Sequence, residues 1–222
     1  MFRPKDGHGL GNILMQLCQV NIVSDKIYDG NRGKFIKVHM CIVKDDTGDV
    51  DIIEPNLYIT PREHKNIKHL IEPTDYAKIF IKKYIHLLNG VEFGIQIRKG
   101  ALSSNKEVVK HSCQHINESG LHKFHEIVKM TDKNIFIAAD CLETKKEFKR
   151  LYGDRIKYID EECEYIVNSL NDEPWVSFTE FFLLGKCPHV YITGGNTDMS
   201  GFSTFGYMAC MHTHTNFTPV FN

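Results

Sequence analysis

Hydrophobic and polar positions follow a regular rhythm from residue 91 to the end of the 222-residue chain. Short apolar runs that are typical of buried strands occur at five places, and stretches with helical spacing separate them. Strands are predicted at 91–97, 135–139, 156–159, 190–193 and 218–221, and helices at 119–129, 142–152, 176–185 and 203–212. This alternation predicts a parallel sheet with right-handed crossovers, and therefore an α/β fold with a Rossmann-like parallel sheet.

The pattern before residue 91 is less regular. Apolar residues at helical spacing predict a helix over 10–28, and alternation predicts a strand over 35–43. A short strand is predicted over 50–53, and an amphipathic helix over 75–88 that ends before a glycine. The change of rhythm divides the chain into a small N-terminal lobe, 1–90, and a Rossmann-like lobe, 91–222.

Three segments follow predicted strands and are expected to converge, because ligands of parallel sheets bind beyond the carboxyl ends of the strands. They begin at Arg98, at Asp140 and at residue 194. Ser203 and Thr204 open a helix whose unpaired N–H groups suit a phosphate, although simple N-capping by Ser203 is the alternative. Arg98 can bind phosphate through two bonds, and a solvated arginine at a strand end is its alternative.

Two further features, the glycine-rich segment 7–12 and Glu180, are each weak evidence for a ligand site when taken alone. Glycines within 7–12 let the backbone approach a ligand, but the spacing fits neither a dinucleotide fingerprint nor a Walker A loop. On this basis Asn12 is an ordinary helix cap. Glu180 lies on an otherwise apolar helix, so its carboxylate needs a partner or a route to water. The two-donor edge of guanine is one such partner, and a position facing solvent is the alternative.

Composition narrows the function classes. A net charge of -1 gives no overall field that would attract nucleic acid or an anionic membrane. The seven cysteines show no CxxC spacing, which favours free thiols in a reducing compartment. No apolar run is long enough for a membrane span and the first residues are not signal-like, so a cytoplasmic location is expected.

Histidines raise the question of a metal. His111 and His115 are four residues apart, and His122 and His125 are three apart, which are spacings that can chelate on a helix. Neither a cysteine pair nor an HExxH motif accompanies them. We therefore predict that the protein uses no metal.

In their order along the chain, four segments resemble motifs of the fucosyltransferase superfamily. They are GLGN at 9–12, GIQIR at 94–98, EFFLLGKCPH at 180–189 and STFGY at 203–207. These motifs are most similar to those of plant xyloglucan-type and bacterial-type α-1,2-fucosyltransferases. The resemblance implies a GT-B-like fold with two facing Rossmann-like lobes, of which the N-terminal one is reduced here. It also implies inverting, metal-independent transfer of fucose from GDP-fucose to a glycan hydroxyl in an α-1,2 linkage, with no cofactor.

The resemblance implies a donor-binding set: Gly11, Asn12, Arg98, Asp140, Glu180, Ser203, Thr204 and Phe205. In this scheme Arg98 binds the β-phosphate, residues 203–205 hold the diphosphate, and Glu180 reads guanine. Arg98 and Asn12 act at the reacting centre. The base that receives the acceptor's proton is His8 or Asp140, and the sequence does not choose between them.

The expected partners are a nucleotide sugar and a glycan acceptor, with no nucleic acid and no membrane span, and the oligomeric state stays open. Three alternatives to a fucosyltransferase remain. The first is another nucleotide-sugar transferase, because the phosphate-holding groups would be the same. The second is a GDP- or glycan-binding module without catalysis. The third is a flavodoxin-like domain with an unrelated ligand.

Overall fold

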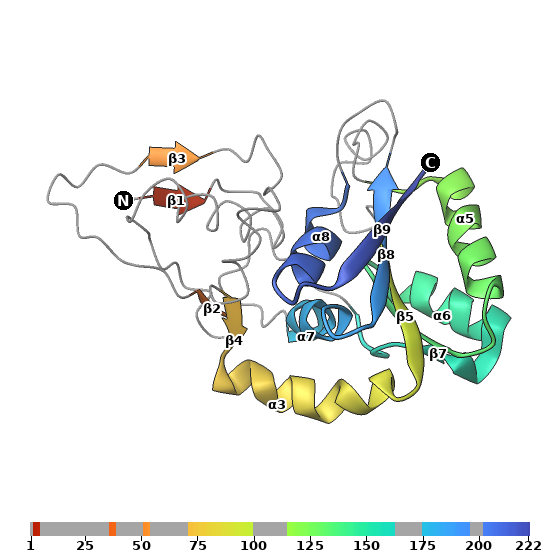
Figure 1. The fold of residues 1–222 in the computed structure, drawn as a ribbon, viewed down its shortest axis with the longest axis horizontal. Coiled ribbons are helices and arrows are strands. Elements are labelled where there is room, and N and C mark those ends of the chain that lie inside the picture. Colours follow the sequence, from red (N-terminus) through yellow and green to blue (C-terminus); the bar gives the residue numbers. More distant parts are fainter. Residues whose placement is uncertain are drawn as a thin grey trace, which may run out of the picture.

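The computed structural model contains a five-stranded parallel sheet, which lies between helices in the right half of Figure 1. The structure describes residues 2–4, 36–38, 51–53, 71–99, 115–162, 175–195 and 202–222. The strands of the sheet are β5 (Val91–Ile97), β6 (Asn134–Ala139), β7 (Ile156–Lys157), β8 (His189–Gly195) and β9 (Asn216–Phe221). Their order is β7-β6-β5-β8-β9, and every neighbouring pair is parallel. The predicted α/β fold with a Rossmann-like parallel sheet is thus confirmed.

Helices cover both faces of this sheet (Figure 1). They are α5 (Glu118–Lys129) and α6 (Leu142–Tyr152) on one face, and α7 (Trp175–Leu184) and α8 (Thr204–Met211) on the other. Phe124 and Phe148 anchor the first pair in one hydrophobic core, and Phe181 and Met208 anchor the second pair in the other. Right-handed crossovers place the helices in this way, because the chain moves across the sheet in opposite directions before and after α7.

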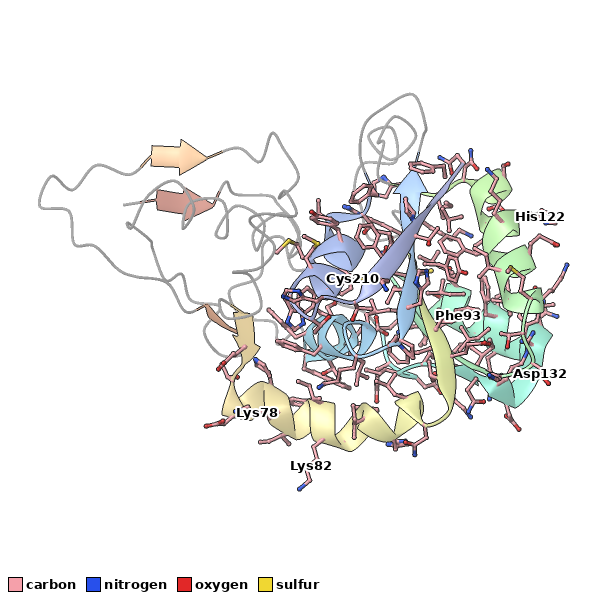
Figure 2. All side chains as sticks on the ribbon, in the orientation of Figure 1. Lys78, Lys82, Phe93, His122, Asp132 and Cys210 are labelled. Carbon is pink, nitrogen blue, oxygen red and sulfur yellow. The ribbon has the colours of Figure 1, made fainter. Side chains whose placement is uncertain are left out.

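Outside α7 lies α3 (Asp75–Tyr84), which continues as a single 3-10 turn, η1 (Ile85–Leu88). Thr74 caps α3 by accepting the N–H of Ala77 at 3.1 Å. Ala77 is buried in the core, whereas Lys78 and Lys82 point outward from α3 (Figure 2). The amphipathic helix predicted over 75–88 is therefore present, and only its last turn departs from α-helical geometry.

In the described part of the chain before α3, four short strands form two pairs. Strands β1 (Phe2–Pro4) and β3 (Asp51–Ile53) pair in parallel. Strands β2 (Ile36–Val38) and β4 (Ile71–Pro73) pair antiparallel. The strands predicted at 35–43 and 50–53 coincide in part with β2 and β3, whereas β1 and β4 were not predicted. The helix predicted over 10–28 lies outside the described residues, and the division at residue 90 stays a prediction.

Each strand and helix predicted after residue 91 is present, with small differences at the ends. The helix expected from residue 203 begins at Thr204, because the backbone of Ser203, with ψ 111, is not helical. Strand β9 contains Pro219, which lacks an N–H donor, and β9 lies at an edge of the sheet where that loss is tolerated. Strand β7 is shorter than the prediction of 156–159, and β9 begins two residues before the predicted 218–221.

Candidate functional site at the carboxyl edge of the sheet

The strand order creates a place where the chain changes direction across the sheet. From β5 the chain proceeds to β6 and β7 on one side, and it then crosses through α7 to β8 on the other side of β5. In open α/β sheets the carboxyl ends of two such strands diverge and leave a ligand crevice. The carboxyl ends of β5 and β8 are therefore the first place to look for a ligand (Figure 1).

Thr193, at the end of β8, joins the segments on both sides of this point. Its Oγ1 accepts the backbone N–H of Arg98 at 2.9 Å and donates to the carbonyl of Gln96 at 3.1 Å. Its own carbonyl accepts the backbone N–H of Ser203 at 2.7 Å. The backbones of Arg98 and Ser203 are therefore both hydrogen-bonded to the same residue, the buried Thr193. The predicted convergence of the segments that follow these two strands is present in the structure.

The first turn of α8 opens at the same place. The first bond of the helix runs from Tyr207 N to Ser203 O at 3.0 Å, so the N–H groups of Thr204, Phe205 and Gly206 have no acceptor within the helix. These N–H groups carry the partial positive charge of the helix end, which attracts an anion. The Phe205 ring packs edge-on against the Phe181 ring of α7, with 5.7 Å between the ring centroids. This contact helps to hold the first turn of α8 against α7.

Ser203 itself does not use its hydroxyl as a cap. The helix has no side-chain capping bond there, and Ser203 Oγ is buried without a hydrogen-bond partner in the part of the chain that the structure describes. The residue has an exposed fraction of 0%. Leaving a buried hydroxyl unpaired costs about 1–3 kcal/mol, so the N-capping alternative does not account for this serine. An oxygen of an incoming anion would remove the deficit.

Asp140 extends the edge to β6. Its backbone N–H donates to the carbonyl of Ile97 at 3.3 Å, and its Oδ1 accepts the backbone N–H of Lys99 at 3.0 Å. The Lys99 ammonium lies 3.6 Å from the exposed carboxylate of Glu118, an arrangement that contributes little to stability in water. The residues that follow β5 and β6 are thus held together through the backbone, with one carboxylate at the junction.

Gly206 lets α8 lie close to the sheet. A Cβ at this position would come within 2.7 Å of Ile192 Cγ2 and 3.0 Å of Gln96 Oε1. Gln96 is buried, and its Oε1 also accepts the backbone N–H of Thr193 at 3.3 Å. The glycine of the STFGY segment therefore sets the distance between the helix end and the strands that carry Arg98 and Thr193.

We expect Gly206→Ala to lower the melting temperature, although alanine has the higher helix propensity. Forcing a methyl group into a filled core typically costs 1–3 kcal/mol, roughly 2–4 °C for each kcal/mol in a domain of this size. Ser119→Ala, at an exposed position of α5, is the control in which propensity alone acts and the melting temperature should not fall. A higher melting temperature for Gly206→Ala would contradict the close approach of α8.

Glu180 has a partner that the sequence analysis did not anticipate. Its Oε1 lies 2.9 Å from Lys145 Nζ of α6, and the exposed fractions of the two side chains are 2% and 0%. Lys145 Nζ also donates to the carbonyl of Glu161 at 3.1 Å, just beyond β7. The alternative that Glu180 faces solvent is wrong, because α7 is buried on every side between the sheet, α3 and α8. Reading of guanine by Glu180 stays a prediction.

A signal for this ion pair was present in the sequence. Leu142, Lys145 and Phe148 are spaced by three residues, so Lys145 lies on the apolar stripe of its helix. A lysine in such a stripe has a buried ammonium or a long stem that reaches water. Glu180 lies on an otherwise apolar helix, so it was a candidate partner of opposite charge for Lys145.

The two histidines of α5, His122 and His125, differ in their surroundings. His125 stacks on Phe148 with 4.4 Å between ring centroids, and its Nδ1 lies 2.9 Å from the Tyr152 hydroxyl. Burial lowers the pKa of His125. His122 points outward from α5 (Figure 2). Among the described residues no cluster of three or more His, Cys, Asp or Glu side chains is placed to hold a metal ion.

Three predicted site residues, His8, Gly11 and Asn12, lie outside the described residues. The structure brings together Arg98, Asp140, Ser203, Thr204 and Phe205 at the carboxyl edge, and it places Glu180 within the core. No helix in the described part of the chain has the length and apolar character needed to cross a bilayer.

No protein-family model matches this chain, and no curated protein matches it. Among solved structures, the apo form of POFUT1 aligns with a TM-score of 0.44 and 13% identity over 78% of this chain and 53% of that one. POFUT1 in complex with GDP aligns with a TM-score of 0.44 and 12% identity over 78% of this chain and 54% of that one. POFUT1 in complex with GDP-fucose aligns with a TM-score of 0.42 and 12% identity over 78% of this chain and 53% of that one. The chain thus spans about half the length of these structures.

Proposed function

We propose that this chain is a glycosyltransferase that moves fucose from GDP-fucose to a glycan hydroxyl with inversion, without a metal, and forms an α-1,2 linkage. The observation that carries the proposal is the junction at Thr193, where the residue after β5 and the start of α8 meet at the topological switch point. The motifs that resemble the fucosyltransferase superfamily, GIQIR and STFGY, are the two segments that meet there.

The diphosphate of the donor would lie over the first turn of α8. The N–H groups of residues 204–206 and the Ser203 hydroxyl would donate to phosphate oxygens, and the Arg98 guanidinium would reach the β-phosphate from the neighbouring strand. These groups are held in place before the donor binds, because Thr193 fixes both backbones. Donors that are already fixed in place stabilise the developing charge without further reorganisation. In other transferases a metal ion stabilises this charge.

In the proposed reaction the bond between fucose C1 and the β-phosphate oxygen breaks, and its electron pair leaves with GDP. The acceptor oxygen forms a new bond to C1 from the opposite face, and its proton passes to a base. His8 and Asp140 are the candidates for that base. Asp140 is half-buried at the carboxyl edge, where the Lys99 N–H bonds one of its two oxygens. A general base of this kind typically contributes 10²–10⁴-fold.

A donor screen tests this function directly. Melting temperatures are measured with GDP-fucose, GDP, GDP-mannose, UDP and ADP, and transfer is then measured with GDP-fucose. We expect guanine nucleotides to raise the melting temperature, since a ligand at a hundred times its Kd adds about 2.7 kcal/mol. In this proposal the guanine edge shares the Glu180 carboxylate with Lys145. Tighter binding of UDP than of GDP would contradict GDP-fucose as the donor and would indicate a UDP-sugar instead. Binding of GDP without transfer would indicate a binding module, and no nucleotide binding would end the proposal.

Ser203→Ala separates a phosphate donor from a helix cap. Because Ser203 Oγ is buried and makes no cap bond, its removal should leave the melting temperature of the free protein unchanged or higher. GDP affinity should fall by about tenfold, the value of one hydrogen bond to a charged group.

The matched control for this variant is Thr74→Val, because Thr74 does cap its helix through Oγ1. We expect it to lose about 1 kcal/mol of stability with no change in GDP affinity. The same pattern in Ser203→Ala would mean that Ser203 is only a cap.

A further inference from the structure

Asn222, which directly follows β9, bonds two segments at the carboxyl edge of the sheet that the proposed donor site does not account for. Its backbone N–H donates to the carbonyl of Gly195 at 2.8 Å, where β8 ends. Its side-chain Oδ1 accepts the N–H of Asn117 at 2.8 Å, and its Nδ2 donates to the carbonyl of His115 at 3.2 Å. Both halves of the side-chain amide are therefore in use.

The residues that Asn222 bonds lie close in the chain, or by hydrogen bond, to Arg98 and Thr193 of the proposed donor site. The backbone N–H of Ile116, between the two residues that Asn222 bonds, donates to the carbonyl of Arg98 at 2.8 Å. Gly195 is two residues beyond Thr193, which bonds both Arg98 and Ser203. Asn222 thus links the end of β8, through its backbone N–H, to the segment that is bonded to the end of β5, through its side-chain amide.

A lysine of α5 supports the same link. Lys123 Nζ donates to the carbonyl of Phe221 at 3.0 Å and to that of Asn222 at 3.2 Å. Asn117 in turn caps α5, since its Oδ1 accepts the N–H of Gly120 at 3.0 Å. The side chain of Asn222 is therefore bonded to the segment that begins α5, and its backbone is bonded to Lys123 of α5 and to the end of β8. The amide carries its acceptor and its donor on separate atoms, so one side chain bonds the N–H of Asn117 and the carbonyl of His115 together.

We propose that Asn222 is a positioning residue of the donor site, which fixes the separation between the segment carrying Arg98 and the end of β8. This inference rests on the proposed function, because the separation matters only if a diphosphate spans it. Displacements of about 1 Å at such a site can lower rates by 10²-fold, so a residue that touches no substrate can still have a large effect.

The test compares Asn222→Ala with Asn216→Ala, an exposed asparagine at the other end of the same strand. GDP affinity is measured by calorimetry, transfer from GDP-fucose by initial rates, and exchange of the Asn117 amide hydrogen by NMR. In Asn222→Ala we expect about tenfold weaker GDP binding, a lower kcat/KM, and faster exchange at Asn117, whose acceptor has been removed. Asn216→Ala should match the wild type in all three measurements.

The possible outcomes separate this inference from the function on which it rests. If the wild-type chain binds no nucleotide, the proposed function fails and the role of Asn222 fails with it. If the wild type binds GDP and Asn222→Ala binds it equally well, the positioning role alone is overturned, even where the melting temperature falls. If Asn222→Ala does not fold, Asn222→Ser takes its place, because the shorter side chain cannot reach both His115 and Asn117.

Discussion

Replacing Arg98 by alanine is expected to lower the rate of fucose transfer by about 10²–10³-fold while the protein still folds. The residue follows β5, and its backbone N–H is bonded to Thr193 beside the start of α8. In the proposed reaction, negative charge would build on the β-phosphate as the bond to fucose breaks, and a guanidinium would stabilise that charge more than it stabilises the intact donor. The loss should therefore appear in kcat as well as in KM.

Two companion variants make this measurement specific. Arg98→Lys keeps the charge but loses the planar fork that holds two oxygens, so it should recover only part of the rate. Arg150→Ala removes an exposed arginine from the last turn of α6 and should leave transfer unchanged. Melting temperatures of all three variants show whether they fold. Transfer near the wild-type rate by a folded Arg98→Ala protein would exclude Arg98 as the phosphate-binding arginine.

The position of Arg98 is a case in which local sequence pattern was enough. The apolar run 91–97 predicted both ends of β5 correctly. A residue that directly follows a parallel strand lies at the carboxyl edge of the sheet, so Arg98 was expected there. The same reasoning placed Asp140 after β6 and the start of α8 after β8. Short-range periodicity fixes which residues follow a strand, and the rules for parallel sheets bring those residues to one edge.

Contacts between distant elements were beyond this reasoning. The sequence does not show that Thr193 bonds Arg98 and Ser203 together, because that depends on β8 lying next to β5 and not next to β7. The link through Asn222 depends in the same way on β9 reaching α5. Strand order is set by how the helices pack across both faces, which single residues do not encode.

The buried pair of Lys145 and Glu180 is expected to give the largest change in stability. Removing one partner leaves an uncompensated charge in the core, so Lys145→Met and Glu180→Leu should each lower the free energy of unfolding by about 3–5 kcal/mol. Exchanging both for apolar side chains removes the pair and its desolvation together, and the double variant should return close to the wild type. Denaturant unfolding of the four proteins measures the coupling, and simple addition of the two single losses would contradict it.

The double variant also decides what Glu180 does for the nucleotide. If the carboxylate only balances Lys145 and helps to hold the carbonyl of Glu161, the stable double variant should bind GDP as the wild type does and should keep its preference over UDP. If the carboxylate reads guanine, the same variant should fold normally and lose that preference, because the two donors of the guanine edge would be left without an acceptor. Measuring GDP and UDP affinities in the wild type and the double variant therefore separates a structural charge from a base-reading one, since stability is matched in the comparison.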